Sequence, residues 1–86
     1  MKVVLERKAL KGLARLNEPL KSRIVKTLKG LEKEPPEGDI KPLAGSKFYR
    51  IRKGDFRIVF AFDGESIRVH NIKSRGQVYK GKGKHK

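Results

Sequence analysis

Arginine side chains alternate with apolar ones in the segment FYRIRKGDFRIVF, and basic residues recur in the segment that follows it. The basic residues of interest are Arg50, Arg52, Arg57, Arg68 and His70. Alternate residues of a β-strand lie on the same face of a sheet, so Arg50 and Arg52 are expected to share one face. Guanidinium groups bind phosphate and carboxylate oxygens through paired hydrogen bonds. The pattern therefore indicates a surface that binds anions.

Two short turns arrange these residues in a predicted sheet. The dipeptides Gly54-Asp55 and Asp63-Gly64 separate three runs that are rich in β-branched and aromatic residues. Two residues are the usual length of a β-hairpin turn, and Asp-Gly is a strong hairpin signal. We therefore predict three antiparallel strands, over residues 48–53, 56–62 and 65–72.

Counting outward from these turns predicts the register of the hairpins. Arg52 is expected opposite Arg57. In the second hairpin, Val59 is expected opposite Arg68, and Arg57 opposite His70. The core face is then formed by Tyr49, Ile51, Phe56, Ile58, Phe60, Phe62, Ile67 and Val69. Like charges opposite each other destabilise a sheet, so a bound anion would explain the other face; the alternative is a solvated surface whose charges are screened by salt.

The N-terminal half is predicted to cover the core face. KVVL, residues 2–5, is typical of a strand. Apolar residues spaced by three and four predict one helix over residues 8–16 and a second helix that has Pro19 in its first turn and stops at Pro35-Pro36. Asn17 is expected to cap the second helix, and the segment 35–46, rich in Pro and Gly, is expected to be a loop. The predicted fold class is α+β, with an N-terminal strand and a two-helix hairpin packed on a small, mainly antiparallel, twisted sheet.

Composition limits the domain organisation and the partners. The 86 residues suffice for one domain, expected over residues 1–80, followed by a basic disordered tail over residues 81–86. The chain has no cysteine and two histidines, which predicts neither disulfides nor a metal site. The 23 Lys and Arg against 9 Asp and Glu give a net charge of +14, which favours a polyanion or an acidic protein as partner. No apolar run suits a signal peptide or a membrane span, so a cytoplasmic protein is expected.

Three motifs resemble those of the RelE/ParE toxin superfamily. They are the Leu-x-Gly loop at residues 43–45, the hairpin motif YRIRKGDFR, and the segment SRGQVY. The similarity extends over residues 1–80 and includes the order strand, helix, helix and sheet. It implies the RelE-like microbial RNase fold and a RelE-like mRNA interferase toxin of a type II toxin-antitoxin module.

The resemblance also implies an activity and a set of site residues. RelE-like toxins cut mRNA in the ribosomal A site by attack of a 2′-hydroxyl on the adjacent phosphate, which leaves a 2′,3′-cyclic phosphate and inhibits translation and growth. The catalytic residues that it implies are Arg50, Arg52, Arg57, Arg75 and Tyr79. Further RNA contacts are expected at Arg68, His70, Lys73, Lys53 and Lys80.

The implied partners are a RelB-like antitoxin that covers the active surface, the 70S ribosome with its mRNA, and ribosomal RNA. No membrane, no cofactor and no direct DNA binding without the antitoxin are expected. Two other interpretations stay open. A ParE-like inhibitor of DNA gyrase shares the fold but usually lacks the basic catalytic set, and a basic sheet can hold RNA phosphates without cutting them.

Proton transfer is harder to assign, because arginine has a pKa above about 12 and cannot be a general base at neutral pH. Tyr79 is the favoured participant, and His70, Lys73 and Lys53 are the other candidates. The hairpin motif has no counterpart of the glutamate-histidine pair that some relatives use.

Overall fold

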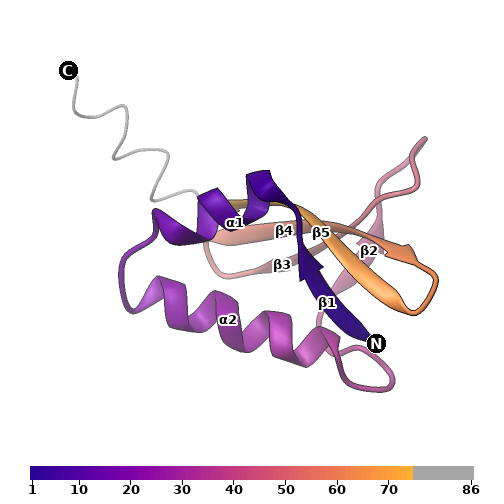
Figure 1. Ribbon diagram of the computed structural model, residues 1–86, viewed down its shortest axis with the longest axis horizontal. Helices are drawn as coiled ribbons and strands as arrows, with labels where there is room; N and C mark the ends of the chain where they lie inside the picture. The colour runs from indigo at the N-terminus through magenta and orange to yellow at the C-terminus, as the bar shows by residue number, and fades with distance from the viewer. Residues whose placement is uncertain (75–86) are drawn as a thin grey trace.

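Two helices lie against one face of a five-stranded sheet in the computed structural model, which describes residues 1–74 (Figure 1). The elements are β1 (Lys2–Leu5), α1 (Arg7–Ala14), α2 (Leu20–Leu31), β2 (Ile40–Pro42), β3 (Tyr49–Lys53), β4 (Phe56–Asp63) and β5 (Ser66–Ser74). The strand order is β1-β5-β4-β3-β2, with β1 parallel to β5 and the other pairs antiparallel. This confirms the predicted α+β class. Neither of the two helices in residues 1–74 is long and apolar enough to cross a membrane.

One strand was missed by the sequence analysis. β2 lies inside the predicted loop 35–46 and pairs with β3, with Ile40 opposite Ile51 and Pro42 opposite Tyr49. Three residues are too short to show a period of two, and proline is usual only on an edge strand. The pairing therefore depends on the partner strand β3 and carries little sequence signal of its own.

The start of α2 also differs from the prediction. Pro19, and not Asn17, is the N-cap residue, and no cap side chain bonds to the helix. Instead, Glu18 Oε1 accepts hydrogen bonds from the backbone N–H of Ser22, at 3.1 Å, and from its hydroxyl group. The bond from the Ser22 hydroxyl lowers the pKa of Glu18 below its ordinary value.

Replacing Glu18 with glutamine is expected to lower the melting temperature at neutral pH and to have little effect near pH 3. A carboxyl group with a lowered pKa in the folded state stabilises the fold above its unfolded pKa, about 4.3 for glutamate, and loses this effect as the pH falls through the folded value. Thermal unfolding followed by circular dichroism checks the difference. Glu65→Gln is the control, because the Glu65 side chain makes no hydrogen bond or ion pair within residues 1–74. A pH-independent loss of stability would contradict the assignment.

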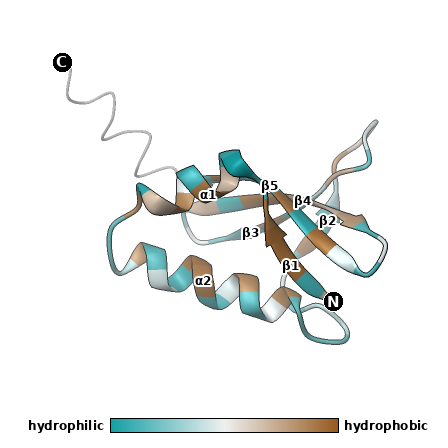
Figure 2. Cartoon of the chain, viewed as in Figure 1, coloured by the Kyte–Doolittle hydropathy of each residue, from teal (hydrophilic) through white to brown (hydrophobic). Residues whose placement is uncertain are grey.

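The core lies between the helices and the sheet. Its fully buried side chains include Ile24 and Leu31 of α2, Ile58 and Phe60 of β4, and Val69 of β5. β1 is hydrophobic over most of its length (Figure 2). The predicted core face is thus confirmed, except for Phe62.

Phe62 is 40% exposed although it has the period of a core residue. The β4–β5 hairpin extends beyond both helices, so the end of this face is not covered (Figure 1). Phe62 packs instead against Tyr49 and Phe60, with ring centroids 5.1 and 5.6 Å away.

The turn of the second hairpin is Gly64-Glu65 and not the predicted Asp63-Gly64. Gly64 has a φ of +64°, which a type II′ turn requires at its first central position. Asp63 therefore stays in β4 opposite Ser66, and its carboxylate binds Arg68 Nε at 2.8 Å.

A β-bulge shifts the register of this hairpin further. Phe60 is opposite Val69, while Val59 is opposite Asn71, which leaves His70 as the extra residue. The later turn has already placed Arg68 opposite Ala61, so the predicted pairing of Val59 with Arg68 is wrong.

The bulge also decides which residues of the last part of β5 face the core. An extra residue reverses the alternation beyond it. Ile72 consequently joins the core opposite Ile58, and Lys73 lies opposite Arg57. The predicted pairing of Arg57 with His70 is wrong because the later turn moves the register by two positions and the bulge by one more.

Candidate nucleic-acid interface

The face of the sheet away from α1 and α2, here called the basic face, carries cations from all five strands. Partners in register on neighbouring strands share a face, as do alternate residues of one strand. These cations include Lys2 of β1, Lys41 of β2, Arg50 and Arg52 of β3, Arg57 of β4, and Arg68 and Lys73 of β5.

Three of these residues form a row across the sheet. Arg52 is opposite Arg57, and Arg57 is opposite Lys73. All three side chains are exposed, and within residues 1–74 none of them forms an ion pair with a carboxylate. Directly opposite Cβ atoms are about 5 Å apart, so the charges repel one another. A phosphate group bound across this cationic row would relieve that repulsion.

Arg50 differs from the three residues of the cationic row in its burial and its contacts. Its side chain is 18% exposed, and its Nη1 atom lies 4.0 Å from Asp39 Oδ2. Nη1 is buried and has no hydrogen-bond partner among residues 1–74. A buried donor without an acceptor costs about 1–3 kcal/mol, more for a charged group, so an anionic oxygen that reached this atom would bind favourably. Arg50 is therefore a preoriented donor beside the cationic row.

Arg68 is largely neutralised by carboxylates. Its guanidinium contacts Asp63 at 2.8 Å and Glu6 Oε2 at 3.7 Å. The hydrogen bond with Asp63 raises the pKa of Arg68 above its ordinary value. Arg68, one of the predicted RNA contacts, is thus already committed to acidic partners within the fold.

His70 lies on the basic face and contacts two residues that are distant in sequence. Its Nδ1 is 3.0 Å from Glu6 Oε1, and its ring centroid is 5.0 Å from that of Phe48. Glu6 directly follows β1, and its N–H donates to the Val69 carbonyl at 2.9 Å. The fold therefore contains a glutamate-histidine pair that the hairpin motif does not reveal, because Glu6 lies 64 positions from His70.

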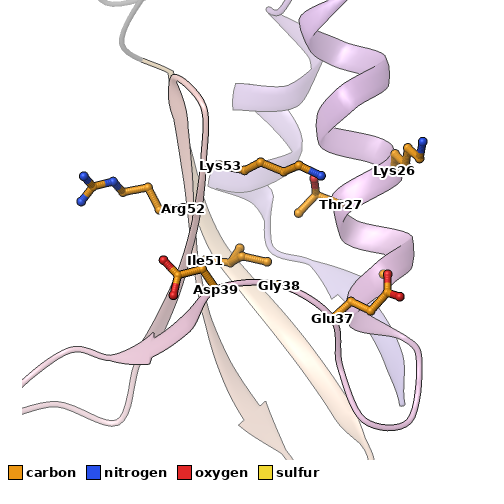
Figure 3. A pocket seen from close by; sticks show the side chains of 9 residues that line it. Lys26, Thr27, Glu37, Gly38, Asp39, Ile51, Arg52 and Lys53 are labelled. Carbon is orange, nitrogen blue, oxygen red and sulfur yellow. The ribbon is translucent and has the colours of Figure 1, made fainter.

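Lys53 lies on the other side of the sheet from the arginines. It lines a cleft of about 530 Å³ between α2 and β3, together with Lys26, Thr27 and Glu37. Figure 3 shows Lys53 directed toward Thr27 of α2, whereas Arg52 points away from that helix. The structure thus separates Lys53 from the other predicted RNA contacts.

The structure brings together Arg50, Arg52, Arg57 and Lys73 on one face. The predicted site residues Arg75, Tyr79 and Lys80, and the predicted tail 81–86, lie outside the described residues. Sequence reasoning missed Phe48, although it alternates with Arg50 and Arg52 and this spacing could have placed it on the basic face.

Solved structures similar to this fold include toxins of RelBE systems. The toxin of the RelE-RelB complex from Pyrococcus horikoshii OT3 is 27% identical over 88% of this chain and 96% of that chain, with a TM-score of 0.71. The Mycobacterium tuberculosis RelBE2 complex matches over 86% and 96% of the two chains, with 20% identity and a TM-score of 0.76. The isolated E. coli RelE toxin matches over 98% and 96%, with 20% identity and a TM-score of 0.71.

Comparison at the level of sequence points to the same superfamily. Among curated proteins, no sequence matches significantly. Residues 3–79 match the family model described as the ParE toxin of the type II toxin-antitoxin system parDE. The chain therefore belongs to the ParE toxin family of type II toxin-antitoxin systems, within the RelE/ParE superfamily, and has a RelE-like fold.

Proposed function

We propose that this toxin is a ribosome-dependent mRNA endonuclease that cleaves in the A site and thereby inhibits translation and growth in the cytoplasm. The observation that carries the proposal is the cationic row of Arg52, Arg57 and Lys73 beside Arg50. The row is exposed and lacks carboxylate partners within residues 1–74. Such an arrangement suits a ligand whose charge is concentrated on phosphate oxygens.

The reaction is attack of a ribose 2′-oxygen on the adjacent phosphorus. The 2′-hydroxyl loses its proton, the bond from phosphorus to the 5′-oxygen breaks, and the products are a 2′,3′-cyclic phosphate and a 5′-hydroxyl. Negative charge increases on the nonbridging oxygens in the transition state. Fixed guanidinium donors stabilise that charge without having to reorganise, and Arg52 and Arg57 carry this role, with Arg50 as the preoriented third donor.

The protons need other groups, since an arginine stays charged at neutral pH. Tyr79 keeps the role in proton transfer that the family resemblance gives it, and Arg75 adds a further guanidinium. Lys73 lies directly opposite Arg57 and places an amine in the row. The row has no carboxylate that could act as a general base, so the toxin depends on the ribosome to orient the message. Ribosomal RNA supplies further phosphates that bind the basic face.

A RelB-like antitoxin is the proposed protein partner. Several of the solved structures similar to this chain are complexes of a RelE toxin with its RelB antitoxin. The antitoxin covers the basic face, and DNA binding belongs to the complex and not to the free toxin.

A purified translation system tests the activity. Added toxin is expected to cut a translated message at sites that primer extension maps to the A site, and to leave the same message intact when ribosomes are omitted. The fragment upstream of each cut should carry a 2′,3′-cyclic phosphate. A folded toxin that gives no cuts in the presence of ribosomes would refute the endonuclease proposal.

Inhibition of DNA gyrase is the second candidate function, and the match to the ParE family model favours it. A supercoiling assay with purified gyrase separates the two candidates. Inhibition of supercoiling without cleavage of mRNA would assign the gyrase function.

A further inference from the structure

Phe48 lies next to the cationic residues and takes no part in the core. It precedes β3, alternates with Arg50 and Arg52, and is half-buried. Its position is set by the turn of residues 43–48. Phe48 N–H donates to Ser46 Oγ at 3.1 Å, and its carbonyl accepts from Leu43 N–H at 2.9 Å. An aromatic ring is thus held at one end of a surface that otherwise carries charges.

His70 completes an aromatic pair with Phe48. The ring centroids are 5.0 Å apart, and the ring planes differ by 32°. The side chain of His70 is 43% exposed. Its Nδ1 donates to the Glu6 carboxylate, because a carboxylate can only accept, and Glu6 therefore fixes the orientation of the imidazole ring. Nε2 is left as the ring nitrogen that can bond to a ligand.

The charges around this pair suit a ligand that combines a planar ring with phosphate. Lys47 Nζ lies 5.8 Å from the centroid of the Phe48 ring. Arg50 is two residues further along the chain, and Arg52 four residues, about 13 Å at the rise of a β-strand. Unpaired bases of RNA stack on aromatic side chains while basic residues hold the backbone. A nucleotide strand therefore matches both parts of the surface.

We infer that Phe48 and His70 form a stacking subsite for one unpaired nucleobase of the RNA, next to the arginines that hold its phosphates. The inference extends the proposed function, since it assigns part of the RNA contact to residues outside the arginine motif. Glu6 acts as a positioning residue for the histidine ring. The subsite reads the face of a base and so adds affinity with little sequence preference.

Binding of a short single-stranded oligoribonucleotide that carries 2-aminopurine tests the subsite. Its 2′-hydroxyls are methylated to prevent cleavage, and the full-length toxin is used. Stacking quenches 2-aminopurine fluorescence, so the wild type is expected to quench it on binding. Phe48→Leu keeps an apolar side chain of similar size but cannot stack, and should lose most of the quenching and about tenfold in affinity.

Two further variants separate stacking from an effect on the fold. Phe48→Tyr retains an aromatic ring and should quench like the wild type. Phe62→Leu changes an exposed phenylalanine on the opposite face of the sheet and should bind RNA normally. Melting temperatures confirm that each variant is folded.

The inference is overturned if Phe48→Leu binds and quenches like the wild type, if Phe62→Leu shows the same loss, or if the wild type does not quench at all. These outcomes are independent of the cleavage test. Loss of quenching in Phe48→Leu supports the subsite even if the toxin cuts no message. Conversely, the toxin could cut mRNA on the ribosome while Phe48→Leu quenches like the wild type. That result would support the endonuclease proposal and refute the subsite.

Discussion

Arg57→Ala is expected to reduce mRNA cleavage on the ribosome by about 10²–10³-fold, the usual effect of removing one fixed donor to a developing oxyanion. Arg57 is the centre of the cationic row, with Arg52 on one side and Lys73 on the other. Loss of its guanidinium removes the donor that can reach a phosphate from the middle of the row. The cleavage rate is measured by primer extension at saturating programmed ribosomes.

The same substitution is expected to stabilise the fold. Removing Arg57 relieves like-charge contacts with both neighbours, and each cross-strand pair is worth about 0.2–1 kcal/mol. Urea unfolding should therefore show a higher free energy of unfolding for Arg57→Ala. A gain in stability together with a loss of activity is the signature of a residue kept for binding an anion.

Controls for this experiment come from the chain itself. Arg57→Lys keeps the charge without the planar fork, and should retain more activity than alanine but less than arginine. Arg23→Ala removes an exposed arginine of α2, on the other layer, and should cleave like the wild type. Equal rates for Arg57→Ala and the wild type would exclude Arg57 from the reaction.

The face on which each strand residue lies was predictable because alternation is a property of the strand alone. Arg50 and Arg52 share a face whatever the register, because they belong to one strand. The first turn fixed the pairing of Arg52 with Arg57 and so placed Arg57 on the same face. The helices followed equally well from apolar spacing. These predictions depend on local geometry, which the sequence states directly.

The second hairpin was less predictable because two nonlocal effects set it. The ion pair between Asp63 and Arg68 favours a turn one residue later than the Asp-Gly signal indicates. The bulge at His70 then allows Ile72 to enter the core, close to α1, where the ideal Cβ position of Gly12 would be 3.2 Å from the Ile72 carbonyl oxygen. The free energy gained by burying Ile72 exceeds the cost of the bulge in the strand pairing. A sequence pattern contains no measure of either free energy.

The remaining differences have the same origin. Phe62 has the correct period for the core but lies beyond the reach of the helices. Lys53 was predicted as an RNA contact. Its position in the alternation of β3, however, places it on the core side of the sheet, directed toward α2. Glu6 meets His70 through the parallel pairing of β1 with β5, a crossover that no short segment encodes.

Gly38→Ala is expected to destabilise the fold by about 2–4 kcal/mol through strain and overpacking. Gly38 has a φ of +124°, which L side chains rarely adopt. A Cβ atom there would overlap Ile51 Cδ1 and lie 3.0 Å from Ile51 Cγ1. Ile51 is 1% exposed, so its side chain has little room to move. Urea unfolding measures the loss.

A second glycine and a double mutant separate the two causes. Gly45 has a φ of +74° with nothing within 4 Å of its Cβ position, so Gly45→Ala reports backbone strain alone and should cost less. Ile51→Val removes Cδ1 and should cost about 0.5–1.5 kcal/mol in the wild type. In the Gly38→Ala background it should cost less or be stabilising, because the clashing atom is gone. Additive losses would show that the two positions do not compete for the same space. Asp39 follows Gly38 and lies beside Arg50. Coupling between Gly38 and Ile51 would therefore also show that core packing positions the loop that contacts Arg50.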